Sequence, residues 1–266
     1  MSKTIFITGA SSGLGKATAK LFAVKGWNVL ATMRQPAKET ELTQFANVTV
    51  LPLEVTRSEQ VSETIQSALK SSDVDVVFNN AGYGLAGPMD GIDDARIVRQ
   101  FETNVFGAMR VTREFIPYFK QKRSGRFITT TSLAGLIGLP LNSVYNASKW
   151  ALEGWSEGLS YELAPFGIKV KTVAPGAVMT DFMSRSLDHV PAPGYDAMNE
   201  ATVKFFVPDM AKISSAESIA QVVWEAATDD QDHLRYVAGD DAIDIYALRQ
   251  KLGNESFRQH LASLVL

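Results

Sequence analysis

The sequence of 266 residues contains no cysteine, so disulfides and thiolate catalysis are excluded. Only three histidines occur, His189, His233 and His260, and they lack the spacing of metal ligands, so we expect no metal site. No apolar run approaches the roughly 18 to 20 residues that a membrane helix needs. The net charge is −3 without a block rich in lysine or arginine, so we expect neither nucleic acid nor a membrane as a partner.

What is present is an ordinary globular composition, with 45% hydrophobic and 21% charged residues. This length suits one large α/β domain, and we expect a single domain over residues 1–266. An apolar, strand-like run begins at Thr4, directly after the first three residues. We therefore expect no signal peptide and a soluble, cytoplasmic protein.

Chemistry is indicated most clearly by the stretch from Ser132 to Lys149. Tyr145 opens a helical pattern and Lys149 follows four residues later, so both side chains lie on one helix face. A nearby ammonium lowers the pKa of a phenol, which is ordinarily about 10. With the Ser132 hydroxyl holding a substrate oxygen, the group suits proton transfer to or from an alcohol or carbonyl. By itself the pair is a weak signal, because Tyr and Lys share this spacing on many ordinary helices.

A glycine-rich turn stands near the start of the chain. The β-branched run at 4–8 predicts a buried strand, the turn spans Gly9 to Gly15, and an amphipathic helix follows. Glycines allow a pyrophosphate to approach the backbone, and the helix N-terminus supplies free N–H groups. Glycine-rich turns are common, but this one lies at the first strand–helix junction, where a dinucleotide would bind.

The end of the second predicted strand bears on cofactor choice. Dinucleotide folds place an acidic residue there to hold a ribose 2′-hydroxyl, or an arginine to accommodate a 2′-phosphate. Here Met33 and Arg34 occupy the place and no carboxylate does. We therefore favour NADP(H) over NAD(H); the alternative is that Arg34 is a solvated loop charge.

Strands and helices alternate along the rest of the chain. Asn79 to Gly82 follow the strand predicted at 74–78, and Asn104 lies inside a helix predicted at 93–120, where asparagine is a poor choice. Asn104 is therefore a candidate functional residue, with a solvent-facing polar residue as the alternative. The pattern predicts a Rossmann-type, doubly wound parallel sheet of about seven strands with helices on both faces.

Two later segments differ from this alternation. Residues 177–213 are long, apolar and irregular, which suggests a substrate lid; the alternative is a helical pair packed as ordinary core. A C-terminal helix is predicted at 242–260.

Taken together, the motifs resemble the short-chain dehydrogenase/reductase family over nearly the whole chain. The resemblance rests on the turn from Thr8 to Gly15, the segment Asn79 to Gly82, the set Asn104, Ser132, Tyr145 and Lys149, and Pro175-Gly176 with Thr180 beyond. It implies a catalytic tetrad of Asn104, Ser132, Tyr145 and Lys149. It implies cofactor binding by Gly9, Ser11, Ser12, Gly13, Leu14, Gly15, Arg34, Glu54, Val55, Asn80, Ala81, Gly82, Tyr145, Lys149, Pro175, Gly176, Val178 and Thr180.

The implied reaction is hydride transfer between a nicotinamide and a carbonyl carbon. Tyr145 would exchange the hydroxyl proton, Ser132 would polarise the substrate oxygen, and Lys149 would lower the pKa of Tyr145. Asn104 would hold a water that links Lys149 to solvent. Two departures bear on the cofactor: Glu54 stands where the family usually has Asp, and Ser12 stands where NADP-dependent members often have Arg or Lys.

Within the family the chain looks most similar to hydroxysteroid- and retinol-type dehydrogenases, which implies a bulky apolar carbonyl or alcohol substrate. Two alternatives remain: an NAD-preferring dehydrogenase, and a non-catalytic regulatory protein that senses dinucleotides. The resemblance also implies a homodimer or homotetramer that pairs through the helices at 93–120 and 145–164.

Overall fold

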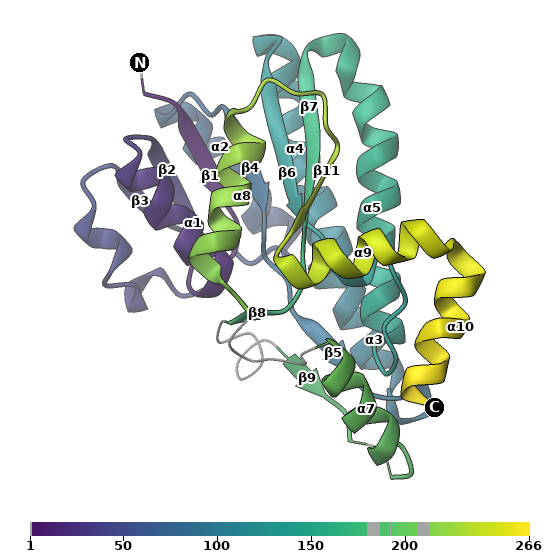
Figure 1. Cartoon of the computed structure of the whole chain (residues 1–266). Coiled ribbons are helices and arrows are strands. Elements are labelled where there is room, and N and C mark those ends of the chain that lie inside the picture. The colour runs from purple at the N-terminus through teal and green to yellow at the C-terminus, as the bar shows by residue number, and fades with distance from the viewer. Residues whose placement is uncertain (1, 180–186, 192, 207–212) are drawn as a thin grey trace.

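Seven parallel strands form the central sheet, in the order β11, β7, β6, β4, β1, β2, β3, in the computed structural model of the chain (Figure 1). The structure describes residues 2–179, 187–191, 193–206 and 213–266. The order reverses between β1 and β4, so the predicted doubly wound sheet is confirmed. The strands are β1 (Thr4–Ile7), β2 (Asn28–Met33), β3 (Val48–Pro52), β4 (Val76–Asn79), β6 (Gly125–Thr130), β7 (Ile168–Pro175) and β11 (Arg235–Ala238).

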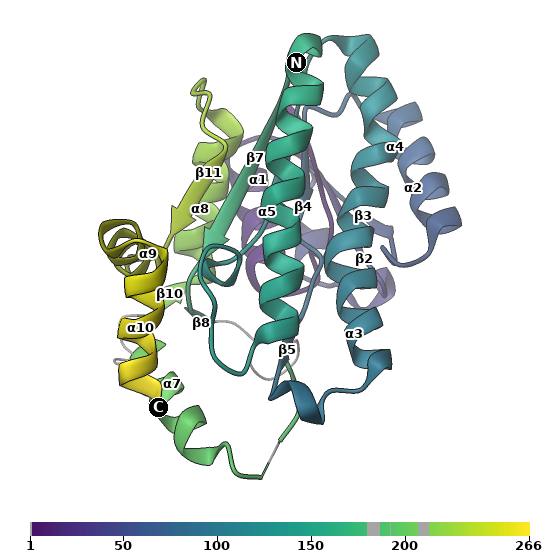
Figure 2. The same cartoon turned by 90° about the vertical axis from the view of Figure 1, so that its right-hand side faces the viewer.

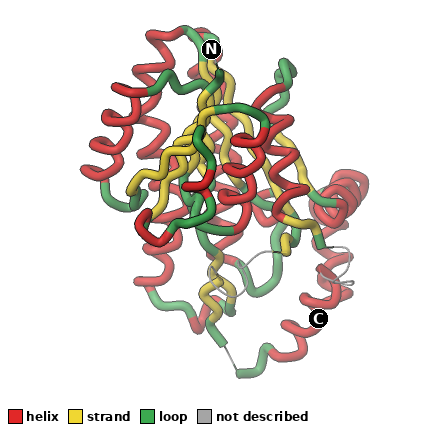
Figure 3. The backbone as a smooth tube through the Cα atoms, turned by 90° about the vertical axis from the view of Figure 1, so that its left-hand side faces the viewer, coloured by secondary structure: helices red, strands yellow, loops and turns green. Residues whose placement is uncertain are grey.

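Helices cover both faces of this sheet (Figures 2 and 3). Side chains alternate along a strand, so Ile5 and Ile7 pack on one face while Phe6 packs on the other. On the first face lie α1 (Gly13–Val24) and α8 (Ala216–Thr228), and on the second lie α2 (Ser58–Ser71), α4 (Gly107–Lys122) and α5 (Ser143–Leu163).

The long helix predicted at 93–120 is present as a continuous helical run over 94–122, but it contains a π-helical turn that was not predicted. The run consists of α3 (Asp94–Phe101), the π-helical turn η4 (Glu102–Phe106) and α4. Asn104 lies in the π turn and is 2% exposed, so the solvent-facing alternative for it is wrong. Such turns often occur at functional sites, because the wider turn redirects side chains.

The single C-terminal helix predicted at 242–260 is two helices, α9 (Asp240–Leu252) and α10 (Asn254–Val265). Gly253, with φ of 75°, ends the first helix, a conformation that favours glycine. Phe257 and Leu261 of α10 pack on Leu133 and Ile137, beside the sheet edge. The C-terminal segment therefore supports a loop that starts at Ser132.

The described part of residues 177–213 is more regular than predicted. It contains β8 (Val178–Met179), which pairs with β10 (Ser214–Ser215), and β9 (Leu187–His189), which pairs with β5 (Gly84–Ala86). Helix α7 (Asp196–Phe206) follows β9 and lies below the sheet in Figure 1. Thr180 lies outside the described residues, and the lid role stays a prediction. Short turns complete the chain at η1 (Pro36–Lys38), η2 (Leu42–Gln44), η3 (Met89–Gly91), η5 (Leu133–Gly135) and η6 (Ala164–Phe166).

Within the described ranges, none of the helices combines the length and the apolar character needed to cross a membrane.

Gly15 tests how tightly the first strand–helix junction is packed. A Cβ at Gly15 would lie 2.5 Å from Asn80 Nδ2 and closer still to the Gly9 carbonyl oxygen. We expect Gly15→Ala to lower the free energy of unfolding by about 2 kcal/mol, because backbone must shift. In α5, exposed Gly158 has no atom within 4 Å of a built Cβ, so Gly158→Ala should stabilise by about 0.5–1 kcal/mol. Urea unfolding of both variants checks this; equal effects would contradict the packing.

Candidate active site

A cavity of about 1260 Å³ lies at the carboxyl edge of the sheet. This is the edge at which ligands bind in open α/β sheets. The described residues Gly15 and Asn104 lie behind its wall, and the other described candidates line it. The predicted residues on the wall are Gly9, Ser11, Ser12, Gly13, Leu14, Arg34, Glu54, Val55, Asn80, Ala81, Gly82, Ser132, Tyr145, Lys149, Pro175, Gly176 and Val178.

The glycine-rich turn is braced against the end of β4. Thr8 Oγ1 accepts the N–H groups of Asn80 at 2.9 Å and Ala81 at 3.0 Å. In return, Asn80 Nδ2 donates to the carbonyl oxygens of Thr8 and Gly9, each at 3.1 Å. Asn80 therefore fixes the turn that follows β1. The role of the Thr8 hydroxyl in holding this turn was not predicted from the sequence. The signal that could have indicated it is a polar residue at the end of a buried strand.

The start of α1 fits a phosphate group. Ser12 is the N-cap residue, and its side chain makes no capping hydrogen bond. The first N–H groups of a helix lack partners within the helix, and they carry the positive end of its dipole. Ser11, Ser12 and Gly13 line the cavity here, so the described residues suit a pyrophosphate.

Arg34 and Glu54 lie together at the cavity rim. Arg34 Nε is 3.9 Å from Glu54 Oε2, and the Arg34 side chain is 76% exposed. A long, exposed ion pair contributes little stability, so the guanidinium is free to turn toward a bound anion. The Glu54 carboxylate, in contrast, would repel an anion bound at Arg34.

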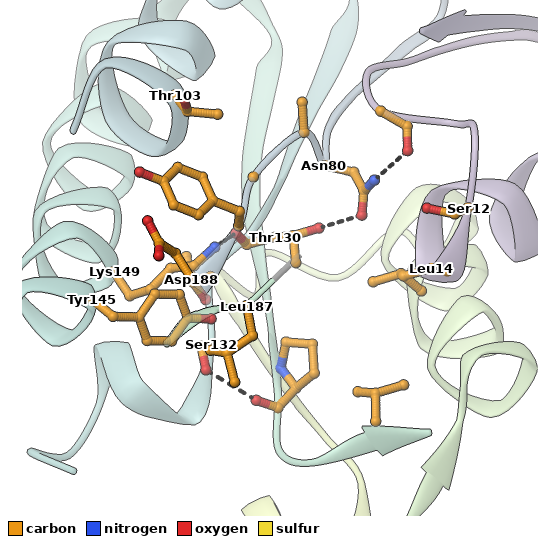
Figure 4. Close-up of a pocket in the computed structure, with 18 of the residues that line it drawn as sticks. Ser12, Leu14, Asn80, Thr103, Thr130, Ser132, Tyr145, Lys149, Leu187 and Asp188 are labelled. Atoms are coloured by element: carbon orange, nitrogen blue, oxygen red, sulfur yellow. Dashed lines mark hydrogen bonds between the residues drawn. The ribbon is translucent and has the colours of Figure 1, made fainter. Parts of the chain in front are cut away.

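Ser132, Tyr145 and Lys149 meet on the opposite wall (Figure 4). Ser132 follows β6; its Oγ accepts the N–H of Ala134 at 3.1 Å and donates to the Pro175 carbonyl at 3.5 Å. Lys149 is buried, and its Nζ donates to the Thr130 carbonyl at 2.9 Å and lies 5.7 Å from the centre of the Tyr145 ring. The helix and the strand end thus gather three polar groups around one point.

Burial controls the acidity of this group. It raises the pKa of Tyr145 to about 12, and hydrogen bonding to Ser132 acts in the opposite direction with smaller effect. Burial also lowers the pKa of Lys149 to about 8, against an opposing effect of Glu153. Desolvation of the phenolate therefore dominates the pKa of Tyr145 in this structure, and the lowering of that pKa by Lys149 stays a prediction.

Asn104 holds the backbone that follows Gly82. Its Oδ1 accepts the N–H of Tyr83 at 3.0 Å, and its Nδ2 donates to the Tyr83 carbonyl at 2.9 Å and to Ser148 Oγ at 3.4 Å. The π turn thereby connects the end of β4 to α5. The predicted contact of Asn104 with a water remains a prediction.

Tyr83 itself was not predicted and lines the cavity. Its ring lies 4.9 Å from the Arg99 guanidinium, and burial raises the pKa of its hydroxyl. Within the described residues, that hydroxyl is buried without a hydrogen-bond partner. Asp188 of β9 lies nearby, 3.5 Å from Arg96 and 3.9 Å from Arg99. Ion pairs to α3 therefore fasten β9 over the cavity.

Asp241, at the start of α9, was also missed. Its Oδ2 accepts the N–H of Ala177 at 2.7 Å, and a side chain at Gly176 would overlap this carboxylate. The contact fixes the turn after Pro175. In the sequence, Asp240 and Asp241 are typical of the first turn of any helix. No sequence pattern indicates the contact between Asp241 and Ala177.

A second cavity of about 410 Å³ adjoins the first. The two share Tyr145, Leu187 and Val203 on their walls. The second extends between β5, β9 and α7, past Ala86, Pro140 and Val190 among others. The main cavity thus continues past Tyr145 into a chamber whose wall combines apolar residues with polar ones such as Asn142, His189 and Asp196.

The buried Lys149 ammonium predicts a pH dependence of stability. Below about pH 8, Lys149 is charged in both the folded and the unfolded state, so the folded state carries the whole free-energy cost of burying the ammonium. Between about pH 8 and its ordinary value of 10.5, the unfolded state binds more protons, so stability rises with pH. The free energy of unfolding of the wild type minus that of Lys149→Met should therefore rise from pH 8 to 10, by at most about 1.4 kcal/mol per unit. A constant difference in urea unfolding would contradict the lowered pKa.

Comparison with known proteins gives a consistent result. The family model for short chain dehydrogenase matches residues 3–190. The chain is 36% identical over 253 residues to Oxidoreductase BOA17 of Botryotinia fuckeliana, which covers 92% of this chain and 91% of that protein. It is 36% identical over 213 residues to retinol dehydrogenase 8 of Homo sapiens, at 77% and 68% coverage.

Solved structures agree. A short-chain dehydrogenase from Streptomyces avermitilis is similar with a TM-score of 0.88 and 30% identity, over 98% of this chain and 95% of that one. Another from Burkholderia cenocepacia, in complex with NADP, has a TM-score of 0.77 and 25% identity, over 100% and 98%. The chain therefore belongs to the short-chain dehydrogenase/reductase family and is an oxidoreductase that acts on CH–OH donors.

Proposed function

We propose that this protein interconverts a carbonyl and a secondary alcohol on a bulky apolar substrate, with NADP(H) favoured over NAD(H). The observation that carries the proposal is one cavity with two suitable ends. The start of α1 can hold phosphate at one end, and Ser132, Tyr145 and Lys149 converge at the other. The relative solved in complex with NADP supports the cofactor class.

The cofactor, when bound, supplies the hydride. We assign its phosphates to the turn from Gly9 to Gly15, a 2′-phosphate to Arg34 with Ser11 and Ser12, and its adenine side to Glu54 and Val55. Asn80, Ala81 and Gly82 would line its middle. Its nicotinamide side would meet Pro175, Gly176, Val178 and Thr180, and Lys149 would hold the nicotinamide ribose.

Tyr145 is the proposed acid in the reductive direction. A phenol with a pKa of about 12 stays protonated at neutral pH, so it can donate its proton to the substrate oxygen as charge develops there. Ser132 polarises the same oxygen. The Lys149 ammonium stabilises the phenolate that remains, and Asn104 would hold the water that returns a proton through Lys149.

The substrate end supports a bulky apolar molecule. The chamber beyond Tyr145 adds about 410 Å³ to the main cavity, and Leu187 and Val203 of residues 177–213 contribute to both walls. This segment is the proposed lid. One relative is named for retinol, itself a large apolar alcohol.

Two alternatives remain in view. The first is an NAD-preferring dehydrogenase. The observation in its favour is Glu54 beside Arg34, because the Glu54 carboxylate would repel a 2′-phosphate. A dinucleotide-sensing regulatory protein is favoured by no observation, since each tetrad residue is present. Pairing through the α3–α4 segment and α5 into a dimer or tetramer stays a prediction.

Tyr145→Phe tests the assignment of the acid. We expect kcat/KM for carbonyl reduction to fall at least about 100-fold, because the substrate oxygen loses its proton donor, with NADPH affinity unchanged. Tyr161→Phe is the matched control on α5, because Tyr161 is 70% exposed and lies outside the cavity. Wild-type turnover by Tyr145→Phe would refute the role.

Arg34→Ala tests the cofactor preference. We expect the Kd for NADPH to rise about 10-fold or more, since a charge-assisted hydrogen bond to phosphate is lost, while the Kd for NADH changes less than about twofold. Nicotinamide fluorescence measures both, with exposed Arg113→Ala on α4 as control. Unchanged NADPH affinity would favour the NAD-preferring alternative.

A further inference from the structure

Glu153 is a buried carboxylate that the proposed reaction does not use. It follows Lys149 by four residues, as Lys149 follows Tyr145, so all three lie along one face of α5. Its side chain is 6% exposed. A carboxylate in such a place requires partners, because burying an unpaired charge is very costly.

The partners of Glu153 come from three strands. Arg235 Nε of β11 lies 2.8 Å from its Oε2. Thr131, just after β6, donates its hydroxyl to Oε1 at 2.5 Å, and Thr172 of β7 donates to Oε2 at 3.4 Å. Glu153 is therefore fixed in position behind the active site.

These contacts set the register of α5 against the end of β6. Three consecutive residues each face one member of the helix face: the Thr130 carbonyl accepts from Lys149, Thr131 donates to Glu153, and Ser132 lies near enough to Tyr145 to oppose the rise in its pKa. The geometry of the reacting groups thus depends on a contact one turn behind them.

Glu153 is also the charged group that acts on Lys149. Its negative charge favours the ammonium and opposes the effect of burial on the pKa of Lys149. The residues that contact Lys149 and Glu153 from the β6 end and from β7 are the neutral Thr130, Thr131 and Thr172. Around them, α5 carries the titratable groups Tyr145 and Glu157, β11 carries Arg235, and α9 carries Tyr246 near Arg235. The described titratable or charged residues elsewhere on the cavity wall are Arg34, Glu54, Tyr83, Asp93, Arg96, Arg99, Asp188 and Asp241.

We propose that the Glu153–Arg235 pair positions Lys149 and sets its charge: Glu153 keeps Lys149 an ammonium beside Tyr145, and Arg235 limits the strength of that effect. Both are positioning residues, since neither lines the cavity. The catalytic consequence rests on the proposed function, whereas the effect on Lys149 does not.

The test measures the titration of Lys149 directly, by NMR of protein with ¹⁵N-labelled lysine side chains, with Lys149→Arg to assign the signal. Glu153→Gln should lower the titration midpoint by about one pH unit, because the ammonium loses a nearby negative charge. Arg235→Met should raise the titration midpoint of Lys149, because the Glu153 carboxylate then no longer pairs with Arg235. A merely structural role does not move the midpoint in opposite directions, so an unchanged midpoint, or shifts of the same sign, overturns the proposal.

If Glu153→Gln fails to fold, the double variant Glu153→Gln/Arg235→Met replaces it, since it leaves no unpaired charge. Its midpoint must lie below that of Arg235→Met alone, and equality refutes the proposal. In turnover, the alkaline limb of the pH profile should follow the NMR midpoint. If the midpoints shift as expected but Tyr145→Phe retains turnover, the proposed function fails and the effect on Lys149 stands.

Discussion

The buried ammonium of Lys149 is the constraint on which the rest of the site depends. An ammonium taken out of water is stable only where fixed dipoles and charges replace its hydration. The Thr130 carbonyl provides one such group at 2.9 Å, and the Glu153 charge acts in the same sense. Both require α5 to lie against the end of β6 in one register. The low pKa of Lys149 shows that compensation is partial, so the fold gives up stability at the place where we propose chemistry.

The topology of the sheet creates the cavity. Its strand order reverses between β1 and β4, and the loops that leave these strands diverge there and leave space at the carboxyl edge. Thr8 and Asn80 join the two strand ends by reciprocal hydrogen bonds, so the glycine-rich turn has a fixed shape. A phosphate site and a proton-transfer site are thus held on one rigid edge. The elements that complete the cavity, β9 and the start of α9, come from much later in the chain and attach through Asp188 and Asp241.

Sequence reasoning succeeded where structure is local. The strand runs, the glycine turn after β1 and the four-residue spacing of Tyr145 and Lys149 depend on near neighbours, and the sheet class follows from their alternation. It failed where the structure depends on contacts between segments that are far apart in the sequence. The π turn at Asn104 serves the backbone of Tyr83, which lies 21 residues earlier. Asp241 contacts Ala177 across 64 residues. The direction of the Tyr145 pKa shift depends on burial, which spacing along a helix does not reveal. Glu153 was within reach, because the spacing of four that links Tyr145 to Lys149 continues to it.

We propose that the cavity brings a nicotinamide and a carbonyl together beside Tyr145. The most direct test is transfer of an isotopic label. The protein is mixed with a panel of bulky apolar ketones and with NADPH that carries deuterium at one of the two faces of nicotinamide C4, and the products are analysed by mass spectrometry. We predict an alcohol with deuterium on the carbinol carbon from one labelled face and not from the other. Tight binding of NADPH with no label in any alcohol would contradict it, and would leave a dinucleotide-binding protein without the proposed activity.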